Sequence, residues 1–409
     1  MATLTVSGLN KTYGKKQALH DVDLDIADGE FFVMLGPSGA GKTTTLKSIA
    51  GLQEIDSGTV TIAGRDMTGV EPYRRNVGMA FESYALYPQR TVSENLASPL
   101  KSKRLGTFSA QDQKDRIDAV TTTLGINHLL SRLPRELSNG QRQRVALGRV
   151  LVRPADVYLL DEPLSHLDAK LRAAMRAELK RLGQMSNTTT VYVTHDYQEA
   201  LSLGDRIGVL KEGRLVQVGT PADVWLRPVD SFVARALGQP EMNLLPARVD
   251  GGALVAGDGA VRIPLTGGDL AVRPGDDVRL GIRPGDVRAT VDEEPADGRV
   301  TMAGRVELAE RLGRQIELSV RVGDANLIVL SDGAHPFAEG DRVALSVATA
   351  KVHVFAGSAG NTAEAATDDT ARLGAADGTA HRGPAHAPPA GRAASTTAPS
   401  TVPGVSNGR

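Results

Sequence analysis

The chain has 409 residues, and its 47 Lys+Arg and 48 Asp+Glu give a formal net charge of −1 at pH 7. This length predicts two or three domains, and the balanced charge argues against a nucleic-acid carrier that depends on overall positive charge. The absence of cysteine excludes disulfide frameworks, thiolate nucleophiles and cysteine-based metal sites. No stretch reaches the roughly 18 apolar residues that a membrane span needs, and the start of the chain lacks a signal-peptide pattern. We therefore expect a cytoplasmic chain that reaches a membrane only through a partner.

The first region, to about residue 235, mixes patterns of strands and helices. Val22, Leu24 and Ile26 alternate with aspartates, which predicts a half-exposed strand. Continuous apolar runs predict strands buried on both faces, and apolar residues at helical spacing predict helices. The buried strands are expected at 31–35 and 157–160, and the helices at 115–124 and 171–182. Buried strands with helices between them indicate an α/β core with a largely parallel sheet.

Two further regions follow, and each differs from the first in composition. Residues 236–356 contain short alternating segments separated by Gly, Pro and Asp, which favours a small antiparallel barrel or sandwich. Its strands are expected at 278–282, 306–308, 316–320, 327–330 and 343–347. Residues 357–409 have no aromatic residue and a single leucine. They cannot bury enough apolar surface to offset the entropy of ordering, so we expect a disordered tail.

A phosphate-binding loop is predicted directly after the strand at 31–35. The sequence there matches G-x-x-x-x-G-K-[ST], which is expected by chance in about 3% of chains of this length, and a plausible helix runs on to about Ala50. Glycines let backbone N–H groups converge on phosphate oxygens, and the start of the helix adds its positive end. Lys42 supplies charge for the β- and γ-phosphates, and the Thr43 hydroxyl can bind Mg²⁺. The predicted nucleotide-binding residues of this loop are Gly36, Pro37, Ser38, Gly39, Ala40, Gly41, Lys42, Thr43 and Thr44.

Two carboxylates, Asp161 and Glu162, follow the apolar strand at 157–160. Such a pair alone is usually a solvated turn or a helix cap, but the upstream phosphate loop favours a functional interpretation. Asp161 can hold Mg²⁺ through water, and Glu162 can orient or deprotonate an attacking water. Transfer of a phosphoryl group requires positioning and charge neutralisation more than covalent chemistry.

Several further motifs together resemble the ATP-binding-cassette (ABC) ATPases. Leu137-Ser138-Asn139-Gly140-Gln141 resembles the LSGGQ signature and is followed by a basic helical segment, 142–149. Residues 82–88 resemble the glutamine loop, 164–168 the D-loop and 194–196 the switch histidine. Tyr13 lies where the family places an aromatic residue against adenine. The sequences of these motifs are most similar to those of the carbohydrate-importer subfamily. The resemblance covers residues 1–356.

The resemblance implies a P-loop NTPase (ABC ATPase) fold with a helical subdomain at about 86–150. It also implies that residues 236–356 form an all-β, OB-like (TOBE-type) regulatory domain. ATP and Mg²⁺ are the implied cofactors, in a dimer in which each nucleotide lies between one subunit's phosphate loop and the other's signature. The implied catalytic residues are Lys42, Glu162 and His195, and the implied nucleotide contacts include Tyr13, Glu82 and Asp161. The implied Mg²⁺ ligands are Thr43, Glu82 and Asp161, and the residues acting across the dimer are Ser138, Asn139, Gly140, Gln141 and Asp168.

The implied function is ATP hydrolysis that drives a membrane importer of a sugar or related polyol. The chain would be peripheral on the cytoplasmic face of the cell membrane, bound to permease subunits through a groove in residues 86–135. An extracellular solute-binding protein would be an indirect partner, and no nucleic-acid partner is expected. ABC ATPases of DNA repair or translation are a weaker alternative, because the chain has a single cassette and no long coiled-coil insertion.

Two positions depart from the family pattern. Asn139 replaces a glycine, and Asn tolerates left-handed backbone best among the other residues; its side chain can either crowd the γ-phosphate or donate to it. Glu82 replaces the usual glutamine. Both substitutions leave open a catalytically weak or regulatory subunit, and either a homodimer or a heterodimer with a conventional ATPase.

Glu82 leads to a prediction about metal dependence. A third carboxylate near Asp161 and Glu162 raises the free energy of the metal-free site, and Mg²⁺ relieves part of that repulsion. Nucleotide binding by the native chain is therefore expected to depend on Mg²⁺ more steeply than binding by Glu82→Gln. Nucleotide titrations over a range of Mg²⁺ concentrations measure this, and superimposable curves for the two proteins would contradict it.

Overall fold

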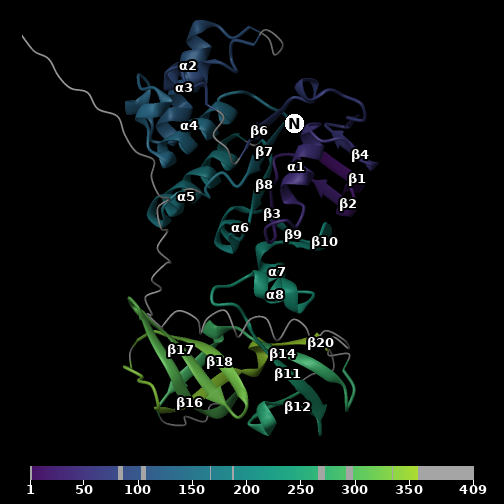
Figure 1. Ribbon diagram of the computed structural model, residues 1–409, viewed down its shortest axis with the longest axis vertical. Coiled ribbons are helices and arrows are strands. Elements are labelled where there is room, and N and C mark those ends of the chain that lie inside the picture. Colours follow the sequence, from purple (N-terminus) through teal and green to yellow (C-terminus); the bar gives the residue numbers. More distant parts are fainter. Residues whose placement is uncertain are drawn as a thin grey trace, which may run out of the picture. The chain divides into compact units, whose positions relative to one another are not determined.

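The apolar runs predicted as doubly buried strands lie inside a six-stranded sheet of order β10-β9-β3-β8-β7-β6 (Figure 1). The computed structural model describes residues 2–357 except 82–85, 103–106, 166, 187, 266–271, 292–297 and 334, so most of the predicted tail lies outside the described residues. Five of the strands are parallel, and β10 is antiparallel to β9. The bounds are Phe31–Leu35 for β3, Val77–Ala80 for β6, Val157–Asp161 for β7, Thr189–Thr194 for β8, Arg206–Lys211 for β9 and Arg214–Gly219 for β10. The predicted α/β class is confirmed.

Apolar clusters on both faces explain why β3, β7 and β8 have no exposed residue. Phe32 and Met34 share one cluster with α1, whereas Val33 and Leu35 share another with α5 and α6. Successive side chains of a strand point to opposite faces, so both faces of β3 are covered. The bounds of these helices are Lys42–Ala50 for α1, Ala169–Ser186 for α5 and Tyr197–Leu203 for α6.

A second, antiparallel sheet, of order β2-β1-β4-β5, contains the strand predicted from alternation. Val22, Leu24 and Ile26 are buried, and the aspartates between them are exposed, as the pattern predicts. The strand nevertheless belongs outside the parallel sheet. The bounds are Leu4–Tyr13 for β1, Lys16–Ile26 for β2, Ser57–Ile62 for β4 and Arg65–Asp66 for β5.

In the described residues between β6 and β7, the α-helices are α2 (Val92–Ala97), α3 (Ala110–Thr123) and α4 (Asn139–Leu151). Helix α3 begins five residues before the predicted 115, because Ser109 and Asp112 form a capping box that starts it earlier. An added Cβ at Gly148 of α4 would lie 3.0 Å from Leu96 and 3.1 Å from Leu124. The glycine therefore permits the close packing of this helical segment. Two short helices follow the main sheet, α7 (Pro221–Leu226) and α8 (Ser231–Ala236).

The all-β region consists of two five-stranded antiparallel sheets, β13-β12-β11-β14-β20 and β15-β19-β16-β17-β18. Residues of both sheets share one apolar cluster. The bounds in the first are Asn243–Asp250 for β11, Ala253–Ala256 for β12, Val261–Pro264 for β13, Asp277–Ile282 for β14 and Val352–Ala356 for β20. Those in the second are Val287–Thr290 for β15, Arg299–Leu312 for β16, Gln315–Val322 for β17, Ala325–Ser331 for β18 and Arg342–Ala348 for β19. Strand β16 is far longer than the predicted 306–308.

Arg283, directly after β14, makes buried contacts with the segment that contains α7 and α8. Its guanidinium lies 3.7 Å from the centre of the Trp225 ring and donates to the carbonyl oxygens of Trp225 (2.9 Å) and Leu237 (2.5 Å). Burial lowers the pKa of Arg283 to about 10. Among the described residues, no helix combines the length and apolar character needed to cross a bilayer.

Candidate active site

The glycine-rich turn between β3 and α1 forms an open cradle of main-chain groups. Gly39 and Gly41 have φ of 78° and 107°, in the left-handed region that glycine adopts without strain. An added Cβ at Gly36 would lie 2.4 Å from the carbonyl oxygen of Leu210. The Gly213 N–H, in the turn after β9, donates to the Ala40 carbonyl at 2.8 Å and fixes the loop from behind. Because α1 begins at Lys42, its first N–H groups have no partner within the helix and can bind an anion.

Lys42 is held inside this loop, with a relative exposure of 5%. Its Nζ donates to the carbonyl oxygens of Gly36 (2.8 Å) and Pro37 (3.0 Å) and lies 3.7 Å from Glu162 Oε1. Burial lowers the pKa of the Lys42 ammonium, and the Glu162 carboxylate opposes this shift. The two carbonyls keep the ammonium in a place where phosphate oxygens can substitute for them.

Thr43 and Asp161 bring two oxygen ligands together across the sheet edge. The Thr43 hydroxyl donates to Asp161 Oδ1 at 3.0 Å, and Asp161, at the end of β7, has an exposure of 4%. Mg²⁺ prefers oxygen ligands and usually binds one or two protein carboxylates together with phosphate oxygens and waters. This pair therefore fits Mg²⁺ that is held jointly with a nucleotide.

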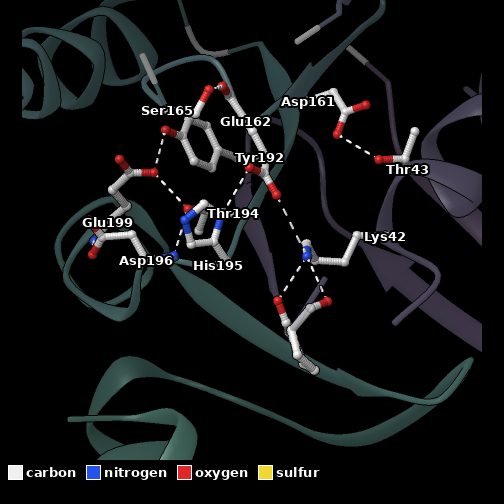
Figure 2. A network of polar contacts seen from close by, with 12 residues as sticks. Lys42, Thr43, Asp161, Glu162, Ser165, Tyr192, Thr194, His195, Asp196 and Glu199 are labelled. Atoms are coloured by element: carbon white, nitrogen blue, oxygen red, sulfur yellow. Dashed lines mark hydrogen bonds and ion pairs between the residues drawn. The ribbon is translucent and has the colours of Figure 1, made fainter. Parts of the chain in front are cut away.

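Glu162 is aimed between Lys42 and His195 by a strained backbone (Figure 2). Its φ is 45°, a conformation that costs a non-glycine residue about 1–3 kcal/mol and is common at functional sites. Its N–H donates to the Val193 carbonyl at 3.0 Å, and its own carbonyl accepts from the Ser165 hydroxyl at 3.0 Å. The carboxylate Oε2 lies 2.9 Å from His195 Nδ1. Neighbouring elements thus hold a strained carboxylate in contact with both other catalytic candidates.

His195 is positioned by hydrogen bonds on both sides of it (Figure 2). The Thr194 hydroxyl accepts from the Asp196 N–H at 2.9 Å and donates to Glu199 Oε2 at 2.8 Å. The Tyr192 hydroxyl donates to the same oxygen at 2.8 Å. Burial raises the pKa of Glu199, which has an exposure of 3%, and the two hydroxyl donors oppose this shift. These contacts fix the turn from β8 to α6 that presents the histidine.

Glu199 gives a prediction about pH. A carboxyl group whose pKa is raised on folding holds its proton better in the folded state, so stability decreases as pH rises from its unfolded pKa through its folded pKa. Glu199→Gln keeps an acceptor for the hydroxyls and cannot ionise. The variant is therefore expected to melt at a higher temperature than the native chain near neutral pH and at a similar temperature in acid. Thermal unfolding between about pH 4 and pH 8 checks this; a destabilised variant at every pH would contradict it.

Tyr13, at the end of β1, keeps a relative exposure of 46%. Its hydroxyl donates to Gln53 at 2.9 Å, and the Lys11 ammonium lies 5.6 Å from the ring centre. A flat ring with an accessible face suits a base, and adenine stacking stays a prediction.

The signature segment begins helix α4. The Ser138 hydroxyl accepts from the Gln141 N–H at 3.3 Å, and the Gln141 side chain accepts from the Ser138 N–H at 2.9 Å. Asn139 is the first helical residue and is not among those with positive φ. The tolerance of Asn for left-handed backbone, expected to matter at this position, is therefore not needed. Ser138 and Asn139 are both exposed, so the side chain of Asn139 faces solvent.

Gly140 and Asp168 bring the signature against the start of α5. An added Cβ at Gly140 would lie 3.0 Å from Leu167, so glycine permits this approach. Asp168 accepts from the Leu171 N–H at 2.8 Å and caps α5. Among the described residues, no hydrogen bond or ion pair joins this pair to the Lys42 loop, and the roles across a dimer stay predictions.

Glu82 lies outside the described residues. Sequence reasoning missed Glu199 and its partner Tyr192, and it identified Thr194 only as part of the segment 194–196. A signal was present: Glu199 precedes Ala200 and Leu203 on the buried face of α6, and a carboxylate at an apolar helical position demands a partner.

Comparison with known families agrees with this arrangement. The ABC transporter family matches residues 19–165, the MalK OB fold domain residues 238–287 and the TOBE domain residues 280–355. A dimeric structure of MJ0796, a bacterial ABC transporter cassette, is 32% identical, with a TM-score of 0.50, over 53% of this chain and 98% of that one.

Curated relatives match over most of the chain. The sn-glycerol-3-phosphate import ATP-binding protein UgpC of Cereibacter sphaeroides is 42% identical over 87% of this chain and 98% of its own length. The same coverage holds for the sulfoquinovosyl glycerol transport ATP-binding protein SmoE of Agrobacterium fabrum, at 42%, and for the oligosaccharides import ATP-binding protein MsmX of Bacillus subtilis, at 40%. The chain therefore belongs to the ABC transporter ATP-binding subunits, in the carbohydrate-importer subfamily with OB-fold and TOBE domains, and is an ABC-type ATPase.

Proposed function

We propose that the chain hydrolyses ATP at the seam of a head-to-tail dimer and so drives solute import through a membrane permease. The observation that carries this proposal is the strained Glu162 carboxylate, held 3.7 Å from Lys42 and 2.9 Å from His195. Glu162 orients the attacking water and accepts its proton, and Lys42 binds the β- and γ-phosphates. His195 contacts the γ-phosphate. Thr43, Asp161 and Glu82 would hold Mg²⁺, which would neutralise charge on the phosphates.

The dimer would complete the site, because among the described residues of one chain no hydrogen bond or ion pair joins the signature to the Lys42 loop. Ser138, Asn139, Gly140 and Gln141 of one subunit would close over the nucleotide of the other, where the N-terminus of α4 favours negative charge. Asp168 would contact the opposite subunit beside them. Nucleotide binding closes this dimer, and hydrolysis with product release reopens it.

The transported solute is proposed from the relatives. Their names cover glycerol 3-phosphate, a sulfoquinovosyl glycerol and oligosaccharides, so a sugar or related polyol is the expected class. The helical segment at about 86–150 would receive the permease, which would hold residues 1–235 at the cytoplasmic face of the cell membrane. Residues 236–356 would form the regulatory domain, with an external solute-binding protein as an indirect partner.

Reconstitution tests this function. The chain is to be purified together with the permease subunits that co-purify with it. The complex is placed in liposomes with the solute-binding protein and assayed for phosphate release with a panel of sugars and polyol phosphates. We expect a transported solute to raise the ATPase rate and to accumulate inside the liposomes. ATP hydrolysis that is indifferent to the permease and every solute would overturn the proposal.

A further inference from the structure

Three arginines stand in one row on the outer face of the sheet β15-β19-β16-β17-β18. Arg305 of β16 lies directly opposite Arg342 of β19 and, on its other side, directly opposite Arg321 of β17. Residues opposite one another in antiparallel strands point to the same face, with Cβ atoms about 4.5–5.5 Å apart, and like charges so placed destabilise the sheet. All three side chains are exposed. The fold therefore keeps an arrangement that packing does not require.

The positive charge of this row is only partly compensated. Arg321 Nε lies 2.8 Å from Glu307 Oε1, and its Nη1 donates to the carbonyl of Asp324 at 3.2 Å. Within the described part of the chain, the side chains of Arg305 and Arg342 make no hydrogen bond and no ion pair. Two guanidinium groups consequently keep all their donors available.

A hollow of about 520 Å³ lies among these side chains. The three arginines line it together with Ala303 and Ala344, which pair in the adjacent row of the sheet, and Val291. Small side chains beside long ones leave space between the guanidinium groups. Sites for small molecules range from roughly 300 to 1,000 Å³, and this hollow, which is open to solvent over most of its extent, has room for a small anion.

We propose that this arginine row binds a phosphate dianion, either free or as a phosphate monoester. The planar guanidinium fork matches phosphate oxygens in a bidentate manner. The guanidinium groups of Arg305 and Arg342, which pair with no side chain among the described residues, carry two positive charges that match the two negative charges of such a group. The site lies in the all-β region, far along the chain from the phosphate loop. The inference does not depend on ATP hydrolysis, and it gives the proposed regulatory domain a class of effector.

Calorimetric titration of the full chain tests the site, with inorganic phosphate and with glycerol 3-phosphate as probes and glycerol as the uncharged comparison. All proteins carry Lys42→Ala, so that the phosphate loop contributes no lysine. Because hydrogen bonds to charged groups are the stronger ones, Arg305→Gln with Arg342→Gln is expected to weaken phosphate binding about a hundredfold or more. Arg288→Gln removes the same charge from neighbouring β15, outside the hollow, and is expected to change the affinity less than about threefold.

Thermal unfolding gives a second readout that a structural role would not produce. Without phosphate, Arg305→Gln relieves like-charge repulsion and is expected to raise the melting temperature, while phosphate no longer stabilises the variant. A lower melting temperature with unchanged stabilisation by phosphate would overturn the proposal. So would equal phosphate affinity in the double variant and Arg288→Gln, or equal affinity for phosphate and chloride at matched ionic strength.

The same measurements distinguish a phosphate ester from free phosphate, and either of these ligands from a second copy of the chain. Tighter binding of glycerol 3-phosphate than of phosphate assigns the site to an ester, and the reverse order assigns it to free phosphate. Residues 292–297, which carry four acidic side chains, lie outside the described residues. If phosphate binds only to a variant in which these four carboxylates are replaced by amides, the proposal is wrong for the native chain. A phosphate-independent dimer that the double variant abolishes would instead assign the row to a second copy.

Discussion

Glu162→Gln is expected to slow phosphate release by about 10²–10⁴-fold, the usual contribution of a general base. The amide keeps the size of the side chain but cannot accept a proton from water, and it loses the charge that faces Lys42 and His195. ATP binding is expected to persist, because the phosphate loop and the Thr43–Asp161 pair remain. Steady-state phosphate release and equilibrium binding of a labelled nucleotide, measured on the same preparation, check both parts.

Glu178→Gln is the matched control, since it makes the same change in α5, where the half-buried Glu178 pairs with Arg181 at 2.6 Å. It is expected to keep the native rate. With Mg²⁺ and ATP, the Glu162 variant is also expected to elute as a stable dimer, because hydrolysis no longer reopens it. Equal phosphate release by the native chain and Glu162→Gln would mean that this carboxylate takes no part in turnover.

Lys42→Met is expected to reduce the affinity for ATP about a hundredfold or more. Two charge-assisted hydrogen bonds to phosphate, each contributing about 1.5–3 kcal/mol, are lost with the ammonium. Methionine preserves most of the apolar stem, and burial already disfavours the charge at this position, as the lowered pKa of Lys42 indicates. The melting temperature in the absence of nucleotide is therefore expected to change little. Nucleotide titration and thermal unfolding measure the two effects separately.

Lys47→Met provides the comparison within the same helix, because Lys47 lies in the last turn of α1 and away from the phosphate loop. It is expected to bind ATP as the native chain does. A Lys42 variant that binds ATP normally would require another cation at the phosphates. A variant that binds ATP weakly and also unfolds readily would assign Lys42 to the stability of the loop.

The chemistry at the ends of the parallel strands was predictable for a simple topological reason. Carboxyl ends of parallel strands meet at one edge of a sheet, where ligands of α/β folds bind. Lys42 after β3, Asp161 and Glu162 after β7, and His195 after β8 therefore had to gather once these strands were recognised. The strain at Glu162 was not predictable, because it arises from hydrogen bonds to Val193 and Ser165 on separate segments.

The partners of β2 and the arginine row could not be predicted, because both depend on pairing between distant segments. Alternation identified β2 as a strand, but its partner β1 pairs in turn with β4, about fifty residues away, and alternation carries no information about partners. The arginine row was hidden for a similar reason. Strand β16 was expected only at 306–308, so Arg305 fell outside it, and the register that aligns three strands is fixed by tertiary packing.

Asn139 has an ordinary helical backbone, so the needs of folding and the choice of the side chain presented to a partner do not conflict at this position. Any residue compatible with a first helical turn can stand there without straining its own chain, so selection can vary the group presented to an opposing subunit while foldability is unaffected. Two paralogous chains could thus diverge in turnover rate by changes at this solvent-facing position alone, and a symmetric machine could become an asymmetric one without any change of architecture.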